Sequence, residues 1–148
     1  MLEITDTNKF GKVIADALSK VEQTVTDAKT KTRWINAISK ATVEIEQNGD
    51  FMTWMEEDKS LLIWSQKSNN IYAANGVCQC RAFEQGEPCF HRAAARIVRL
   101  YKQMEAVQVE MVQLYMKADN VPVQAKDVPY LKPTTHVKAE RIAGIRIN

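Results

Sequence analysis

The sequence lacks the apolar segments that direct a chain into or across a membrane. Its longest uninterrupted apolar runs are a few residues, as at residues 61–64, whereas a helix that crosses a bilayer needs about 20. The N-terminus carries Glu3 and Asp6 and has no apolar run after a basic start, so we expect no secretory signal. We therefore expect a cytoplasmic protein without a membrane segment.

The chain also lacks a strong net charge of either sign. Twenty Lys and Arg residues against 18 Asp and Glu residues give a formal net charge of +2, with histidine neutral. Without a large basic excess, a surface that binds nucleic acid must be a local cluster of cations. The composition, 45% hydrophobic and 26% charged over 148 residues, is typical of one globular domain with appendages.

Recognisable catalytic patterns are missing. The chain shows no paired carboxylates, no nucleophile with an adjacent base and no Gly-rich phosphate loop, so we expect no catalytic residues and no enzymatic activity. Cysteine is scarce too, and its count of three is odd. The cysteines therefore cannot all pair within the chain, which favours a reducing compartment.

Residues 1–50 are predicted to form an N-terminal helical region. Apolar residues recur at three- and four-residue steps over residues 10–25, after a cap at Asp6 or Thr7, and a second run covers residues 34–45. The period weakens between the two runs, so we expect a break or bend within residues 27–32. One continuous helix stays an alternative, because the weak stretch holds neither Pro nor Gly.

The residues that follow change to aromatic and β-favouring types. Short strands are expected at residues 51–54, 61–66 and 70–77, and the turn residues between the last two predict a hairpin. We expect the three tryptophans, Trp34, Trp54 and Trp64, to lie in the core.

The strongest helical signal runs from Phe90 to about Lys117, where one narrow apolar seam continues for three heptads. We favour packing of this seam on the N-terminal helices, because three heptads are near the minimum for a stable coiled coil. A homodimeric coiled coil is the alternative. The seam consists of Ala93, Ile97, Leu100, Met104, Val107, Met111 and Leu114.

Residues 119–148 are expected to be a tail or a strap over the surface, because three prolines lie among basic, small and polar residues. The weak alternation of residues 141–147 is compatible with an added edge strand. His136 has no companion ligand in this segment and is expected to be solvated.

The chemical signal of the sequence is Cys78-Gln79-Cys80, followed after eight residues by Cys89-Phe90-His91. Three thiolates and one imidazole make the closed tetrahedral ligand set that a structural zinc ion prefers. Gly86 and Pro88 can return the intervening loop, so that the site closes at the start of the helix. Four protein ligands leave no open position for water, which disfavours a catalytic metal.

This pattern, preceded by a hairpin and followed by a helix, resembles the SWIM-type zinc finger over about residues 54–101. The resemblance implies that Cys78, Cys80, Cys89 and His91 are the zinc ligands. It also implies binding to DNA or to proteins, often near recombination or transposition functions. Small stand-alone SWIM proteins occur in prokaryotes, their viruses and mobile elements, so the nucleoid or a host cytoplasm is the implied location.

These patterns predict an α+β fold in which N-terminal helices and the long helix pack with a small β-hairpin, in a ββα-like zinc finger. The expected organisation is a helical region at 1–50, the finger with its long helix at 51–118 and the tail at 119–148. One structural Zn²⁺ per chain would join the hairpin to the helix.

Basic residues beside the zinc ligands are the candidates for binding nucleic acid. Arg92, Arg96 and Arg99 recur at helical spacing and share one face, and Arg81 and Lys102 extend the patch. A solvated face with ion pairs to nearby glutamates is the alternative. The expected partner is DNA, single- or double-stranded, and the competing hypothesis is a protein adaptor or homodimer that uses the seam or the tail.

Overall fold

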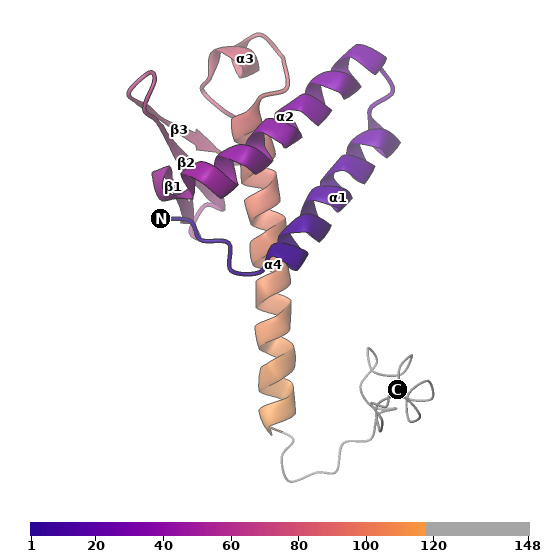
Figure 1. Cartoon of the computed structure of the whole chain (residues 1–148), viewed down its shortest axis with the longest axis vertical. Coiled ribbons are helices and arrows are strands. Elements are labelled where there is room, and N and C mark those ends of the chain that lie inside the picture. Colours follow the sequence, from indigo (N-terminus) through magenta and orange to yellow (C-terminus); the bar gives the residue numbers. More distant parts are fainter. Residues whose placement is uncertain (118–148) are drawn as a thin grey trace. The chain divides into compact units, whose positions relative to one another are not determined.

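The computed structural model describes residues 1–117, with side chains to residue 114. The predicted tail at 119–148, with His136 and the edge strand at 141–147, lies outside this range. Met1–Ala106 form one compact unit. Mixed helix and sheet confirm the α+β prediction (Figure 1).

Two helices, α1 (Thr7–Thr24) and α2 (Ala28–Asn48), begin at aspartate caps. The Asp6 carboxylate accepts a hydrogen bond from the backbone N–H of Lys9 at 2.9 Å, as predicted, and Asp27 accepts one from Thr30 at 2.7 Å. Such caps satisfy N–H groups that have no partner within the helix. The break between the helices falls at residues 25–27 and overlaps the predicted interval at Asp27, whose side chain caps α2.

The sheet has three antiparallel strands in the order β1 (Met52–Met55), β2 (Ser60–Ser65) and β3 (Asn70–Ala74), after a single 3-10 turn, η1 (Gly49–Phe51). The predicted hairpin is the β2–β3 pair, with Leu61 opposite Ala74. β1 adds a third strand to it, because Asp58 accepts hydrogen bonds from Ser60 and forms a second tight turn. Gly49 lies so close to the Leu2 carbonyl that a Cβ there would stand 2.7 Å from its oxygen.

The short helix α3 (Arg81–Glu84) follows the sheet, and α4 (Phe90–Lys117) matches the predicted long helix. The first part of its seam packs inside the protein: Ala93 and Ile97 are buried, and Leu100 and Met104 pack against the core. Val107 and Leu114, further along the seam, are 59% and 61% exposed.

One hydrophobic core joins α1, α2, the sheet and the first four turns of α4. Tyr101 on α4 is fully buried, and its hydroxyl accepts hydrogen bonds from the backbone N–H groups of Thr5 at 3.2 Å and Asp6 at 3.1 Å. The ring packs edge-on against Phe10. These contacts fix the start of α1 against the middle of α4.

Candidate metal centre and cationic pocket

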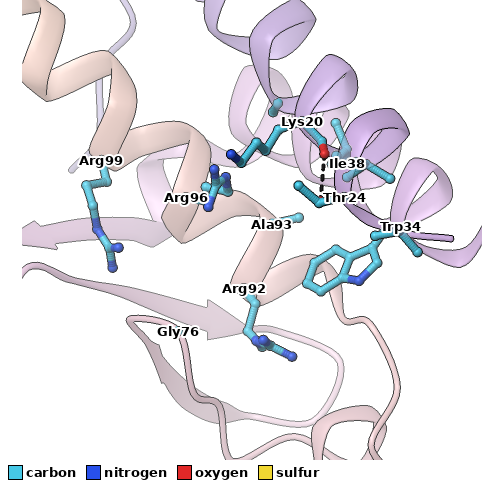
Figure 2. Close-up of a pocket in the computed structure, with 12 residues that line it drawn as sticks. Lys20, Thr24, Trp34, Ile38, Gly76, Arg92, Ala93, Arg96 and Arg99 are labelled. Carbon is cyan, nitrogen blue, oxygen red and sulfur yellow. Dashed lines mark hydrogen bonds between the residues drawn. The ribbon is translucent and has the colours of Figure 1, made fainter. Parts of the chain in front are cut away.

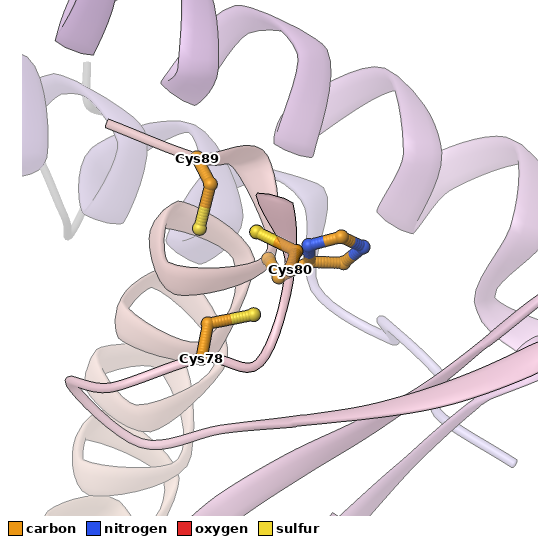
Figure 3. Close-up of side chains that lie close together, drawn as sticks. Cys78, Cys80 and Cys89 are labelled. Carbon is orange, nitrogen blue, oxygen red and sulfur yellow. The ribbon is translucent and has the colours of Figure 1, made fainter. Parts of the chain in front are cut away.

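The three cysteines and His91 come together in one buried cluster. Cys78 follows β3, Cys80 immediately precedes α3, Cys89 immediately precedes α4 and His91 lies in the first turn of α4. One ligand atom from each residue lies within 4.8 Å of the others. Figure 3 shows the three cysteine side chains directed toward a common space. The residues predicted as metal ligands are therefore close enough to hold one metal ion.

The chain between the two halves of the cluster folds as a compact loop. α3 makes one helical turn, and Gly86 ends it with a φ of 74°. The backbone N–H groups of Gly86 and Glu87 donate to the carbonyl groups of Phe83 and Ala82, at 2.9 and 2.8 Å. A positive φ is accessible to glycine at little cost, so Gly86 returns the chain as predicted.

Burial controls the charge of these groups when no metal is bound. It raises the pKa of the Cys78 thiol to about 12 and also raises that of Cys89. Burial opposes ionisation of Cys80 as well, but hydrogen bonds, first from the Phe83 N–H and then from the Cys78 and Cys89 thiols, leave its pKa lowered. Burial, followed by the charge of Lys40, lowers the pKa of His91 to about 4. The imidazole is therefore neutral near pH 7, which is the form that binds a metal.

One nitrogen of the cluster has no hydrogen-bond partner among the described residues, which also fits a metal site. His91 Nδ1 is buried and has no hydrogen bond within the described residues. Buried polar atoms are usually satisfied, so an orphaned imidazole nitrogen beside three thiols indicates a missing ligand. Tyr72, Ala82 and Phe83 cover the cluster with apolar surface.

The predicted arginine face lies on α4, directly after the ligands. The Arg92 guanidinium lies between two aromatic rings, 5.2 Å from the centre of Trp34 and 5.0 Å from that of Phe83. Arg99 Nη2 donates to the carbonyl groups of Asn75 at 3.2 Å and Lys59 at 3.5 Å. Arg92 and Arg99 thus contribute to packing as well as to surface charge.

These arginines border a pocket of about 300 Å³ between α1, α2 and α4 (Figure 2). Lys20 of α1 faces the arginines of α4 across it, a cation that the local sequence pattern did not reveal. Every charged side chain along its wall is a cation. The lining comprises Ala17, Lys20, Val21, Thr24, Val25, Trp34, Ile38, Gly76, Arg92, Ala93, Arg96 and Arg99.

Two residues predicted to extend the patch lie elsewhere. Lys102 pairs with Glu105 at 3.0 Å and does not line the pocket. Arg81 borders a different depression, beside Cys80, which Arg33 and Lys40 also line. Among the described residues, no glutamate forms an ion pair with the three arginines of α4.

The tryptophans differ from one another. Trp34 and Trp54 are half-buried and pack against the core, whereas Trp64 is 43% exposed. The prediction of a core position was wrong for Trp64, because strand alternation directs Leu61 and Ile63 inward and Trp64 outward. Trp64 instead packs edge-on against Phe51, with ring centres 5.4 Å apart.

Within residues 1–117, no helix combines the length and the apolar character needed to span a bilayer. Comparison of the chain with protein families, curated proteins and solved structures found no match.

Proposed function

We propose that this protein is a non-catalytic nucleic-acid-binding module, with DNA as its expected ligand, whose fold is stabilised by one structural zinc ion. One observation carries the binding function: Lys20, Arg92, Arg96 and Arg99 converge on one pocket whose wall includes no carboxylate. Phosphate groups are the ligands that such a cluster attracts, and they supply most of the affinity in nucleic-acid complexes.

Zinc is the metal that suits the ligand set best. Three thiols and one imidazole are soft and borderline donors, and four buried ligands complete a tetrahedron. Bonds of about 2.3 Å to sulfur and 2.0 Å to nitrogen imply ligand separations of roughly 3.5–3.8 Å. A small inward movement of the side chains reaches that geometry. The same donor set supports the resemblance to a SWIM-type finger.

The metal centre and the cationic pocket are mechanically connected. Arg92 directly follows the ligand His91 in the first turn of α4. Arg99 donates a hydrogen bond to the carbonyl of Asn75, which lies three residues before Cys78. A metal that fixes both ends of the intervening loop therefore also fixes the arginines, so zinc would organise the binding surface without contacting the ligand.

Salt dependence gives a direct test. Four phosphate contacts predict a slope of log K against log salt of about −2.8 for single-stranded DNA and about −3.6 for duplex. Exchanging the two exposed cations in Lys20→Gln/Arg96→Gln should halve that slope and lower the affinity at least tenfold. Fluorescence anisotropy with labelled 20-nucleotide DNA, RNA and duplex DNA measures both quantities.

A matched control removes the same charge elsewhere. Lys12 and Lys67 are exposed and do not line the pocket, so Lys12→Gln/Lys67→Gln changes the net charge equally. We expect this control to keep the wild-type slope and most of the affinity. Equal losses of affinity in both double variants would show that the effect depends only on net charge. That result would contradict a local site.

Self-association is a second candidate, and a specific observation favours it. Val107 and Leu114 continue the apolar seam of α4 at heptad spacing, yet both are exposed. A second copy of the chain could cover this stretch. A dimer in solution that Met111→Glu converts to a monomer would support this role, and a monomer at all concentrations would contradict it.

A further inference from the structure

The pocket beside the arginines has two chemically distinct parts. Val21, Trp34 and Ile38 form an apolar wall, and Lys20 and the arginines supply the positive charge. Figure 2 shows Arg92, Arg96 and Arg99 extending from one helix, with Lys20 and Thr24 on the helix opposite. A site for phosphate alone needs no apolar wall, so the pocket suits a ligand with an anionic group and a flat apolar body.

The size of the pocket supports the same conclusion. Its volume of about 300 Å³ is at the lower end for cavities that bind small organic molecules. That space accommodates one nucleobase with its sugar. A paired base in a stacked duplex cannot enter, because it would first have to leave the stack.

The cations around this space are incompletely satisfied by the protein. The Nε atoms of Arg92 and Arg99 are buried and have no hydrogen-bond partner within the described residues. Arg96 is exposed, and the described part of the chain provides no ion pair for it. Thr24 donates its hydroxyl hydrogen to the Lys20 carbonyl at 2.7 Å, so its oxygen retains acceptor capacity.

We propose that this pocket binds one unpaired nucleotide of a single strand, with its base against Val21, Trp34 and Ile38. The flanking phosphates contact the four cations of the pocket, Lys20, Arg92, Arg96 and Arg99. This inference rests on the proposed nucleic-acid-binding function and makes it specific: the protein prefers single-stranded over double-stranded DNA. Single-stranded binders commonly combine a cationic track with surfaces that hold bases.

Filling the apolar part of the pocket tests the inference without changing charge. Val21 is half-buried on the wall, and Val21→Phe occupies the space expected for the base. Val43, 46% exposed on α2, does not line the pocket, so Val43→Phe is a matched control. If Val21→Phe does not fold, Thr24→Tyr fills the same pocket from its exposed rim.

We expect wild-type protein to bind a 20-nucleotide single strand at least tenfold more tightly than the matching duplex. Val21→Phe should weaken single-strand binding at least fivefold, weaken duplex binding by a smaller factor and melt at the wild-type temperature. Val43→Phe should change neither affinity. Equal affinity of wild type for strand and duplex, or unchanged strand binding by the folded pocket variants, would overturn the inference while the proposed function stands.

Trp34 provides a second measurement. In a Trp54→Phe/Trp64→Phe background it is the only tryptophan, and single-stranded DNA should change its emission more than duplex does. Adding a free mononucleotide and inorganic phosphate separates the possible sources of the ligand. A mononucleotide that binds as tightly as the strand would overturn the assignment to a strand. If no nucleic acid binds wild type even at low salt, the proposed function itself fails.

Discussion

The Tyr72 ring of β3 stacks on the His91 imidazole of α4, with ring centres 4.4 Å apart and planes inclined by 27°. Within the part of the chain that the structure describes, the Tyr72 hydroxyl forms a hydrogen bond only with the Ser68 hydroxyl, at 3.4 Å. The contact therefore depends on the aromatic ring, which restrains the orientation of a proposed metal ligand from the sheet side.

Removing this ring should weaken metal binding. We expect Tyr72→Ala to lower the zinc affinity about tenfold, because the imidazole then loses the ring that packs on it from the sheet and is restrained less before the metal binds. Tyr72→Phe keeps the ring and should bind zinc as the wild type does. Competition against a chromophoric chelator gives both affinities, and equal losses in the two variants would show that the hydroxyl, not the ring, is responsible.

The role of His91 as the fourth ligand can be tested by replacing it with another ligand type as well as by removing it. His91→Ala should abolish stoichiometric zinc binding and lower the melting temperature, because metal-binding free energy is part of the folding free energy. His91→Cys restores four ligands and should keep the metal. Elemental analysis and thermal unfolding with and without chelator measure these effects. A wild-type protein that purifies without zinc and melts unchanged in chelator would contradict the proposed centre.

Arg96 and Arg99 are expected to act differently, although both border the pocket. Arg99 donates to the carbonyl groups of Asn75 and Lys59, whereas Arg96 is exposed. Arg99→Gln should therefore lower stability, by about 1–2 kcal/mol, as well as DNA affinity. Arg96→Gln should lower only the affinity. Urea unfolding beside anisotropy separates the two effects, and a purely structural role for both would leave binding by Arg96→Gln unchanged.

The Asp27 cap of α2 leads to a prediction of how the stability of the protein depends on pH. Hydrogen bonding by Thr30 lowers the pKa of the Asp27 carboxyl below its usual 3.8, so the folded state binds this proton less readily than the unfolded state. The stabilisation from the ionised cap is fully present above about pH 5 and is lost as the pH falls through the folded pKa.

Asp27→Asn isolates this contribution, because asparagine caps a helix without titrating. The melting temperature of wild type minus that of Asp27→Asn should be constant above about pH 5 and should decrease toward pH 3. A difference that does not vary with pH would show that folding leaves the pKa of the Asp27 carboxyl unchanged.

Local patterns predicted much of the structure. The heptad alternation predicted α4, and the spacing of three cysteines and one histidine predicted their cluster, because both signals lie in short stretches of chain. Lys20 was missed because only the packing of α1 on α4 brings it to the pocket that Arg92 also lines, and no local pattern encodes that packing. The strand β1 was missed as a partner of β2 because its turn is formed by charged residues rather than by Gly or Asn.

The hydrogen bonds from Thr5 and Asp6 to the Tyr101 hydroxyl also constrain the order in which the protein can assemble. Thr5 and Tyr101 are 96 positions apart in the sequence. At about 5–20 residues per second, the ribosome takes roughly 5–20 s to make the intervening chain. Once Asn48 has been added, the α1–α2 pair is complete, but the amides before α1 lack their acceptor until Tyr101 follows. Docking of α4 is consequently a late event in the life of the nascent chain, and the N-terminal helices must remain soluble until it occurs.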